Sequence, residues 1–157
     1  MMTGDQQALW EEAWELLRVE KNQAETDGKA KYIDYGFIVF PAAKVYEGFL
    51  KSYFYQMGLV SKGAYLSDHF RIGKALNPDL PFKYRNHTWV FDDLSRLCGF
   101  GTARQLWEAW KLARNRVFHY DAREMTNLNL TEAEERLTVL KEAMRSAAAC
   151  EIRVKRD

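Results

Sequence analysis

The sequence has few cysteines and few histidines, and each scarcity excludes a class of protein. Two cysteines among 157 residues are too few for a disulfide-stapled scaffold, and Cys98 and Cys150 lie too far apart in the chain to predict a bonded pair. None of the three histidines stands four residues from another ligand on one helix, and no Cys-x-x-Cys motif occurs. We therefore expect no metal, no bound cofactor and a reducing, cytoplasmic compartment.

Long apolar runs are also missing. The most apolar stretch, Tyr32–Met57, is interrupted by Pro41, Lys44, Glu47 and Lys51, which argues against a membrane span. The chain does not open with a basic segment followed by an apolar one, so we expect no signal peptide. Glycine-rich phosphate loops and the Gly-x-Ser-x-Gly nucleophile motif are absent as well.

The composition is that of a soluble globular protein, with 47% hydrophobic and 29% charged residues. A length of 157 residues favours a single domain over residues 1–157. The net charge of +1 conceals an asymmetry, because residues 1–27 carry −5 and residues 61–123 carry +5. A basic middle favours an anionic partner, although this charge is modest for a dedicated nucleic-acid binder.

Helical periodicity recurs along the chain, and no segment shows the sustained alternation of a strand. We predict an all-α fold, a bundle of four to five helices with one or two short extra helices. The expected helices are one capped by Thr3 or Asp5 and ending by residue 27, one passing through Pro41 to Gly58, one from Ser67 or Asp68 to Leu76, one over Thr88–Leu97, one capped by Thr102, and a last one opened by a capping box at Thr131.

The stretch Tyr32–Met57 predicts a central helix that is apolar nearly all round. Its charged residues Lys44, Glu47 and Lys51 recur at spacings of three and four, so they share one face of that helix. Such a stripe is either a solvent-facing strip or part of a site.

A second candidate site lies at the end of a later helix, around Arg114 and His119. These residues are five apart, which places them about 140° from each other on an unbroken helix, so they converge only if the helix loosens or ends between them. Together they suit RNA cleavage without a metal: His119 can move a proton and Arg114 can hold a phosphate, with Asn115 orienting either. The alternative is that His119 merely caps helix carbonyls.

The loop before Thr88 gathers Lys83, Arg85, Asn86 and His87 within five positions. Loops carry function more often than their share, so this loop is a candidate functional segment. A merely solvated connection is an equally acceptable interpretation.

The segment Arg114–His119, RNRVFH, resembles the signature of the HEPN superfamily, an arginine followed after four to six residues by a histidine. A polar residue, here Asn115, often comes directly after the arginine. The segment Pro41–Lys51, PAAKVYEGFLK, is similar to a helix of ribonuclease LS-type toxins, where a basic residue and a glutamate three apart precede Gly and Leu-Lys. Together the two motifs span about the middle half of the chain, from residue 41 to residue 119.

The resemblance implies a HEPN-like helical bundle that acts as a metal-independent endoribonuclease, commonly a toxin or host-defence effector restrained by an antitoxin or regulatory protein. It also implies a homodimer in which the motifs of two protomers form one composite active site. By resemblance, Arg114 and His119 are the catalytic pair, Asn115 supports them, and Glu47 and Lys44 line the cleft. We therefore expect Lys44 and Glu47 to face the end of the Arg114 helix and not bulk solvent. We assign contacts with the RNA substrate to Lys44, Lys51, Arg85, Arg116 and Tyr120.

The sequence thus predicts cleavage of RNA by attack of a 2′-hydroxyl, with His119 as general acid and base and Arg114 as phosphate clamp. The alternative is a non-catalytic HEPN-type module that binds RNA or a nucleotide, or that serves in an assembly. Five tryptophans and eight tyrosines suit both a core and an interface.

Overall fold

A computed structural model describes residues 2–119 and 126–154, and every regular element within them is helical. The elements are α1 (Gly4–Asp27), α2 (Gly36–Gln56), α3 (Lys62–Tyr65), α4 (Ile72–Ala75), the 3-10 turn η1 (Phe82–Tyr84), α5 (Phe91–Cys98), α6 (Phe100–Trp110), the π-helical turn η2 (Lys111–Asn115), α7 (Arg116–Phe118) and α8 (Leu130–Val154). The all-α prediction is confirmed. Among these residues no helix combines the length and apolar content needed to cross a membrane.

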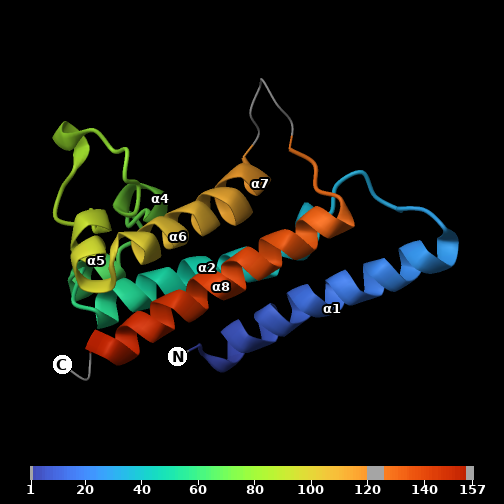
Figure 1. The fold of residues 1–157 in the computed structure, drawn as a ribbon, viewed down its shortest axis with the longest axis horizontal. Helices are drawn as coiled ribbons and strands as arrows, with labels where there is room; N and C mark the ends of the chain where they lie inside the picture. Colours follow the sequence, from blue (N-terminus) through green and yellow to red (C-terminus); the bar gives the residue numbers. More distant parts are fainter. Residues whose placement is uncertain (1, 120–125, 155–157) are drawn as a thin grey trace.

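Helices α2 and α8 lie in the middle of the bundle (Figure 1). Helix α1 packs against both of them on one side, and α6 packs against α8 on the other side, next to α5. The acidic helix α1 and the elements α4–α7 of the basic middle therefore lie on opposite sides of the α2–α8 pair.

Helix α2 supplies the largest share of the core. It begins before Pro41 and continues through it, as the apolar pattern predicts, and its side chains Tyr46, Tyr53 and Phe54 are almost fully buried. Burial raises the pKa of the Tyr46 hydroxyl well above its ordinary value, so this group stays protonated. It donates a hydrogen bond of 3.0 Å to the carbonyl of Leu106, which ties α2 to α6.

The ends of the long helices follow local side-chain chemistry. Thr3 caps α1 in a reciprocal box with Gln6, and Gly28 ends α1 with a φ of 65°, a conformation that favours glycine. The capping box of α8 begins at Asn129, two residues before the expected cap Thr131. The amide of Asn129 donates to the Glu132 carboxylate over 2.8 Å, and the amide of Glu132 donates to the Asn129 side chain over 2.9 Å.

Three of the predicted helices have other bounds in the structure than expected. The segment from Ser67 to Leu76 is helical only over α4, because the Ser67 hydroxyl accepts a bond from the amide of His69 in a local turn. The predicted helix over Thr88–Leu97 begins later, as α5. Gly99, and not Thr102, precedes the first residue of α6.

The two cysteines form a disulfide, contrary to the expectation from their spacing. Cys98 ends α5 and Cys150 lies near the end of α8, and the bundle brings their Cα atoms to 5.4 Å. Both side chains are buried, and the Tyr53 hydroxyl lies 3.2 Å from Cys98 Sγ. Distance along the chain does not exclude pairing, since helix packing decides which residues meet.

Reduction should lower the stability of the protein. The bond joins residues 52 positions apart, and a crosslink of that size stabilises a domain by about 2–4 kcal/mol, chiefly by restricting the unfolded chain. We expect urea unfolding with a reductant to show this loss in the free energy of unfolding. The double variant Cys98→Ala/Cys150→Ala is the control and should not respond to reductant. Two free thiols per chain in denaturant without reductant would contradict the bond.

Candidate functional site

The end of α6 does not continue as a regular helix. Lys111–Asn115 form a π-helical turn in which the amide of Arg116 donates to the carbonyl of Lys111, five residues earlier. Helix α7 then ends at Phe118, and His119 takes an extended conformation with φ −111° and ψ 128°. Single π turns are rare and recur at functional sites. The helix both loosens and ends between Arg114 and His119, as their convergence requires.

Arg114 and His119 meet as a direct result. The Nη1 atom of Arg114 lies 3.2 Å from Nε2 of His119. A guanidinium can only donate, so the imidazole nitrogen accepts this bond. The contact therefore needs a neutral imidazole that carries its proton on Nδ1, and the bond from Arg114 then occupies the lone pair of Nε2.

Two further groups hold the Arg114 side chain. Its Nε atom donates to Oε2 of Glu47 on α2 over 3.2 Å, and both side chains are 32% exposed. The guanidinium carbon also lies 5.8 Å from the ring centroid of Trp110, which stacks on Trp107 at 5.6 Å. A guanidinium carries five N–H donors, so the contacts with Glu47 and His119 leave others for a ligand.

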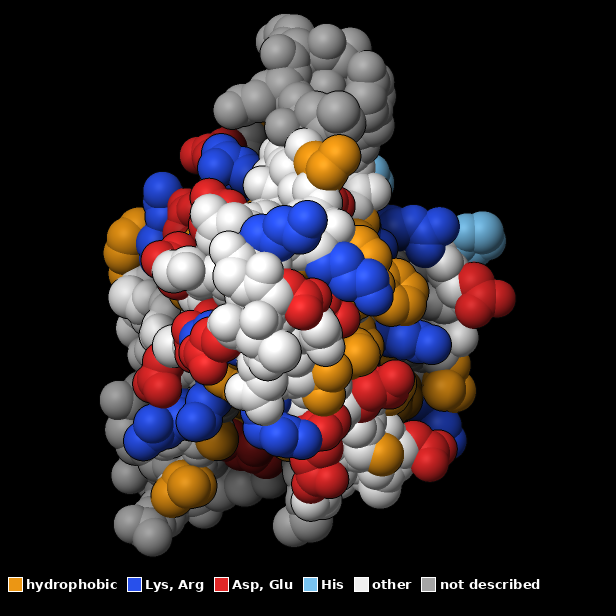
Figure 2. All heavy atoms as spheres, turned by 90° about the vertical axis from the view of Figure 1, so that its right-hand side faces the viewer, with side chains coloured by type: hydrophobic (Ala, Val, Ile, Leu, Met, Phe, Trp, Pro, Cys, Tyr) orange, Lys and Arg blue, Asp and Glu red, His pale blue; other side chains and the backbone are white. Residues whose placement is uncertain are grey.

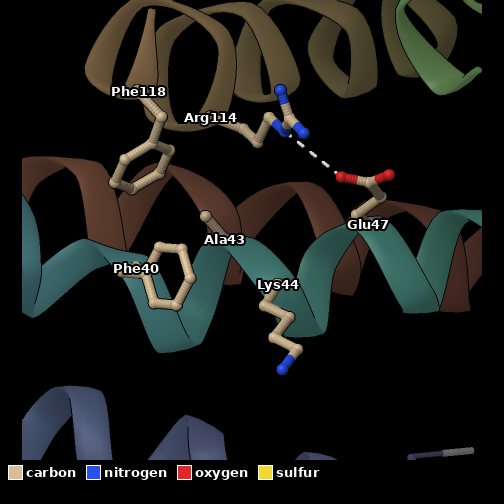
Figure 3. A pocket seen from close by; sticks show the side chains of 6 residues that line it. All are labelled: Phe40, Ala43, Lys44, Glu47, Arg114 and Phe118. Carbon is tan, nitrogen blue, oxygen red and sulfur yellow. Dashed lines mark hydrogen bonds and ion pairs between the residues drawn. The ribbon is translucent and has the colours of Figure 1, made fainter.

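A pocket of about 250 Å³ opens beside this arrangement (Figure 3). Its walls are Phe40, Ala43, Lys44 and Glu47 of α2, Arg114 of η2 and Phe118 of α7. Figure 3 shows Arg114 and Glu47 pointing toward each other from opposite helices, with the two phenylalanine rings beside them. The pocket thus joins a cation, a carboxylate and aromatic surface.

The structure brings three of the predicted site residues together, namely Arg114, His119 and Glu47. Lys44 also lines the pocket, but it is exposed and extends away from the ion pair in the view of Figure 3. Our expectation that Lys44 turns away from bulk solvent is therefore wrong. An ammonium is strongly hydrated and its flexible stem lets it reach water.

Three other predicted residues lie near the pocket without lining it. Asn115 is half-buried at the last position of the π turn, directly after Arg114, and Arg116 is exposed at the start of α7. Lys51 is half-buried on α2, four residues beyond Glu47. Tyr120 lies outside the described residues.

Arg85 does not line this pocket, and its contact with RNA stays a prediction. Its Nε donates to the carbonyl of Leu80 over 2.8 Å, and its guanidinium lies 4.0 Å from the ring centroid of Trp89. These contacts fix the arginine within the loop between α4 and α5, which Figure 1 places well away from α7. Within the loop, Arg85 thus donates to a backbone carbonyl and packs over the indole ring of Trp89.

Comparisons of the chain with models of protein families, with curated proteins and with solved structures found no match. The site is therefore interpreted from its own geometry. Within residues 2–119 and 126–154, no three histidine, cysteine or acidic side chains come together in a way that could hold a metal ion.

Sequence reasoning missed the aromatic part of the site. Phe40 stands four residues before Lys44, so extending the charged stripe by one turn of α2 would have included it. Phe118 directly precedes His119 within the Arg114–His119 motif. Trp110 and Arg114 are four residues apart, so helical periodicity could have predicted that the indole lies beside the guanidinium.

Gly73 of α4 offers a test of how tightly this region is packed. A Cβ added there would lie 2.9 Å from both Cζ2 and Cζ3 of Trp110, a rigid and buried ring. Gly73→Ala should therefore lower the free energy of unfolding by about 1–3 kcal/mol, since an overpacked core must shift. Gly101→Ala is the matched control, because no atom lies within 4 Å of its added Cβ. Equal urea midpoints for both variants would contradict this packing.

Proposed function

We propose that this chain is a metal-independent endoribonuclease. The observation that carries the proposal is that one guanidinium, Arg114, contacts both the imidazole of His119 and the carboxylate of Glu47 beside an open pocket. A fixed cation next to a neutral imidazole is what phosphodiester cleavage by an internal hydroxyl needs. The HEPN-like motif at Arg114–His119 supports the same reaction.

In the proposed reaction, Nη1 of Arg114 moves from His119 to the phosphate, and the freed lone pair of His119 Nε2 takes the proton of a 2′-hydroxyl as that oxygen bonds to the adjacent phosphorus. The bond from phosphorus to the 5′-oxygen breaks, and that oxygen receives a proton from the imidazolium or from its counterpart in a second copy of the chain. The products are a 2′,3′-cyclic phosphate and a 5′-hydroxyl. Arg114 offsets the charge that builds on the phosphate oxygens.

Glu47 acts on this reaction through Arg114. Its carboxylate accepts from Nε, so the remaining guanidinium donors are directed by a group anchored on a different helix. Asn115, the polar residue directly after Arg114, is the candidate to orient the phosphate or the arginine. Glu47 is therefore a positioning residue in this mechanism.

RNA binding in the proposal is local and does not depend on a broad basic surface. Figure 2 shows Lys and Arg side chains interspersed with Asp and Glu on the end of the molecule that it presents. Arg114 would contact the scissile phosphate, while Lys51, Arg116 and the exposed Lys44 contact neighbouring phosphates. An enzyme that holds only a few phosphates fits a chain with a net charge of +1.

The biological setting follows from the resemblance. We propose a cytoplasmic toxin or host-defence effector that forms a homodimer with a composite site and is restrained by an antitoxin or regulatory protein. Exposed Tyr32, Ile33 and Phe37, which lead into the site end of α2, support contact with a second copy. The Cys98–Cys150 disulfide does not favour that compartment, because disulfides are rare in a reducing cytoplasm, but its burial limits attack by soluble thiols.

The central prediction concerns the catalytic pair. His119→Ala should lower the rate of RNA cleavage by about 10²–10⁴-fold, the usual contribution of a general acid and base, and Arg114→Ala by about 10²–10³-fold. Arg114→Lys should not restore activity, because lysine cannot make the same forked contacts. The assay follows a labelled RNA in the presence of EDTA and identifies the cyclic phosphate product.

The controls are His69→Ala and Arg104→Ala, which change the same residue types at exposed positions outside the pocket. Both should cleave like the wild type, and all variants should retain the helical circular dichroism of the parent. Undiminished cleavage in both site variants, or cleavage that needs added metal, would refute the mechanism. Binding of RNA without any cleavage by the wild type would favour the non-catalytic binding module.

Glu47→Ala tests the positioning role. Without the carboxylate the Arg114 side chain is held less firmly, and a small misplacement of a phosphate clamp costs about 10²-fold in kcat/KM. Glu12→Ala, on the exposed face of α1, is the matched control and should leave kcat/KM unchanged. A loss equal to that of His119→Ala would instead indicate that Glu47 takes part in proton transfer.

A further inference from the structure

Two aromatic rings at the rim of the pocket have no role in the mechanism so far. Phe40 is 56% exposed and Phe118 is 36% exposed, whereas aromatic residues further along α2, such as Tyr46 and Phe54, are buried. The two rings come from different helices, α2 and α7, and their centroids lie 5.5 Å apart at an interplanar angle of 86° (Figure 3). Exposed aromatic residues clustered at a pocket commonly mark a binding surface.

The geometry of this pair leaves aromatic surface available. In an edge-to-face pair, the ring that presents its edge has neither of its faces covered by the other ring. Both rings line the same pocket as Arg114 and Glu47, so a flat group stacked there would lie directly beside the guanidinium. Stacking on aromatic side chains, next to a phosphate contact, is how proteins hold unpaired nucleotides.

The size of the pocket restricts what can enter it. Its volume of about 250 Å³ is below the roughly 300–1,000 Å³ typical of sites that enclose a whole small molecule. It therefore suits one flat fragment of a longer ligand whose remainder lies outside. The apolar rings offer no base-specific hydrogen bonds, so they discriminate little among bases.

We propose that Phe40 and Phe118 form a stacking platform for one unpaired base of the RNA, next to the phosphate held by Arg114. This inference rests on the proposed function. It adds one requirement to the proposed reaction, namely that a nucleotide adjoining the cleaved bond is unstacked. A base in a duplex cannot reach the platform without first being unpaired.

The test compares Phe40→Ala and Phe118→Ala with the wild type on a labelled single-stranded oligoribonucleotide. Loss of one base stack should raise KM by about 5- to 100-fold, with kcat changed less, and Phe40→Trp should restore KM. Phe82→Ala, an 85% exposed phenylalanine in η1 outside the pocket, is the matched control and should leave KM unchanged. Equal losses in Phe82→Ala would overturn the proposal.

An abasic substrate separates stacking from other effects. Removing the base at each position around the cleaved bond in turn should, at one position, raise the KM of the wild type as much as Phe40→Ala does. At that position Phe40→Ala should suffer no further loss, because the two changes remove the same contact. If no abasic position raised the KM of the wild type, the stacking platform would be overturned.

The competing occupant of these rings is a second copy of the chain. Sedimentation of Phe40→Ala and Phe118→Ala identifies this case. If the wild type is a dimer, and the variants dissociate and regain activity at high protein concentration, the platform is overturned in favour of a contact between protomers.

If the wild type does not cleave RNA, the same oligonucleotides are used in fluorescence anisotropy. Weaker binding of the abasic RNA by wild type, but not by Phe40→Ala, would uphold the platform although the proposed nuclease failed.

Discussion

The burial of α2 on nearly every side is the constraint on which the rest of the structure depends. A helix this apolar is stable in water only when α1, α6 and α8 cover it, and those contacts fix the order of the bundle. The side chains on α2 that remain exposed or half-exposed beside α7 include Phe40, Lys44 and Glu47. The candidate site forms where the covering of α2 is incomplete, so its location follows from packing.

The ion pair between Arg114 and Glu47 contributes more to geometry than to stability. Both side chains are partly solvated, and pairs of that kind stabilise a fold by about 0–1 kcal/mol. Its effect is to connect the π turn to α2 and to direct the guanidinium toward the pocket. Stacked Trp107 and Trp110 support the same side chain from within the bundle. The arginine is thus oriented before any ligand binds, which is the condition for electrostatic catalysis.

Much of the fold was predictable because its signals are local. The capping box at Thr3, the terminating Gly28 and the apolar periodicity of α2 act within a few residues of one another, and each element formed as they predict. The errors concern choices between nearby competitors, such as Asn129 over Thr131 as the cap of α8. Both residues can cap a helix, and only the packing of the whole segment selects one of them.

Contacts between residues far apart in the sequence were predictable only in part. Glu47 and Arg114 are 67 residues apart, and their proximity was expected from motifs and not from any periodicity of the chain. Cys98 and Cys150 were expected to remain apart, yet the return of α8 along the bundle brings them together. Sequence separation carries little information about such contacts, because helix packing angles and loop paths decide them.

The sequence by itself determined the all-α class, the limits of the first long helix, and the residue types available for phosphate chemistry. Hydrophobic periodicity and capping operate over one or two helical turns, so they can be read without coordinates. Only the tertiary structure decided that the helix loosens into a π turn at Lys111–Asn115, which lets Arg114 reach His119. It likewise decided that Lys44 faces water and that Phe40 meets Phe118, since such contacts depend on how neighbouring helices are placed.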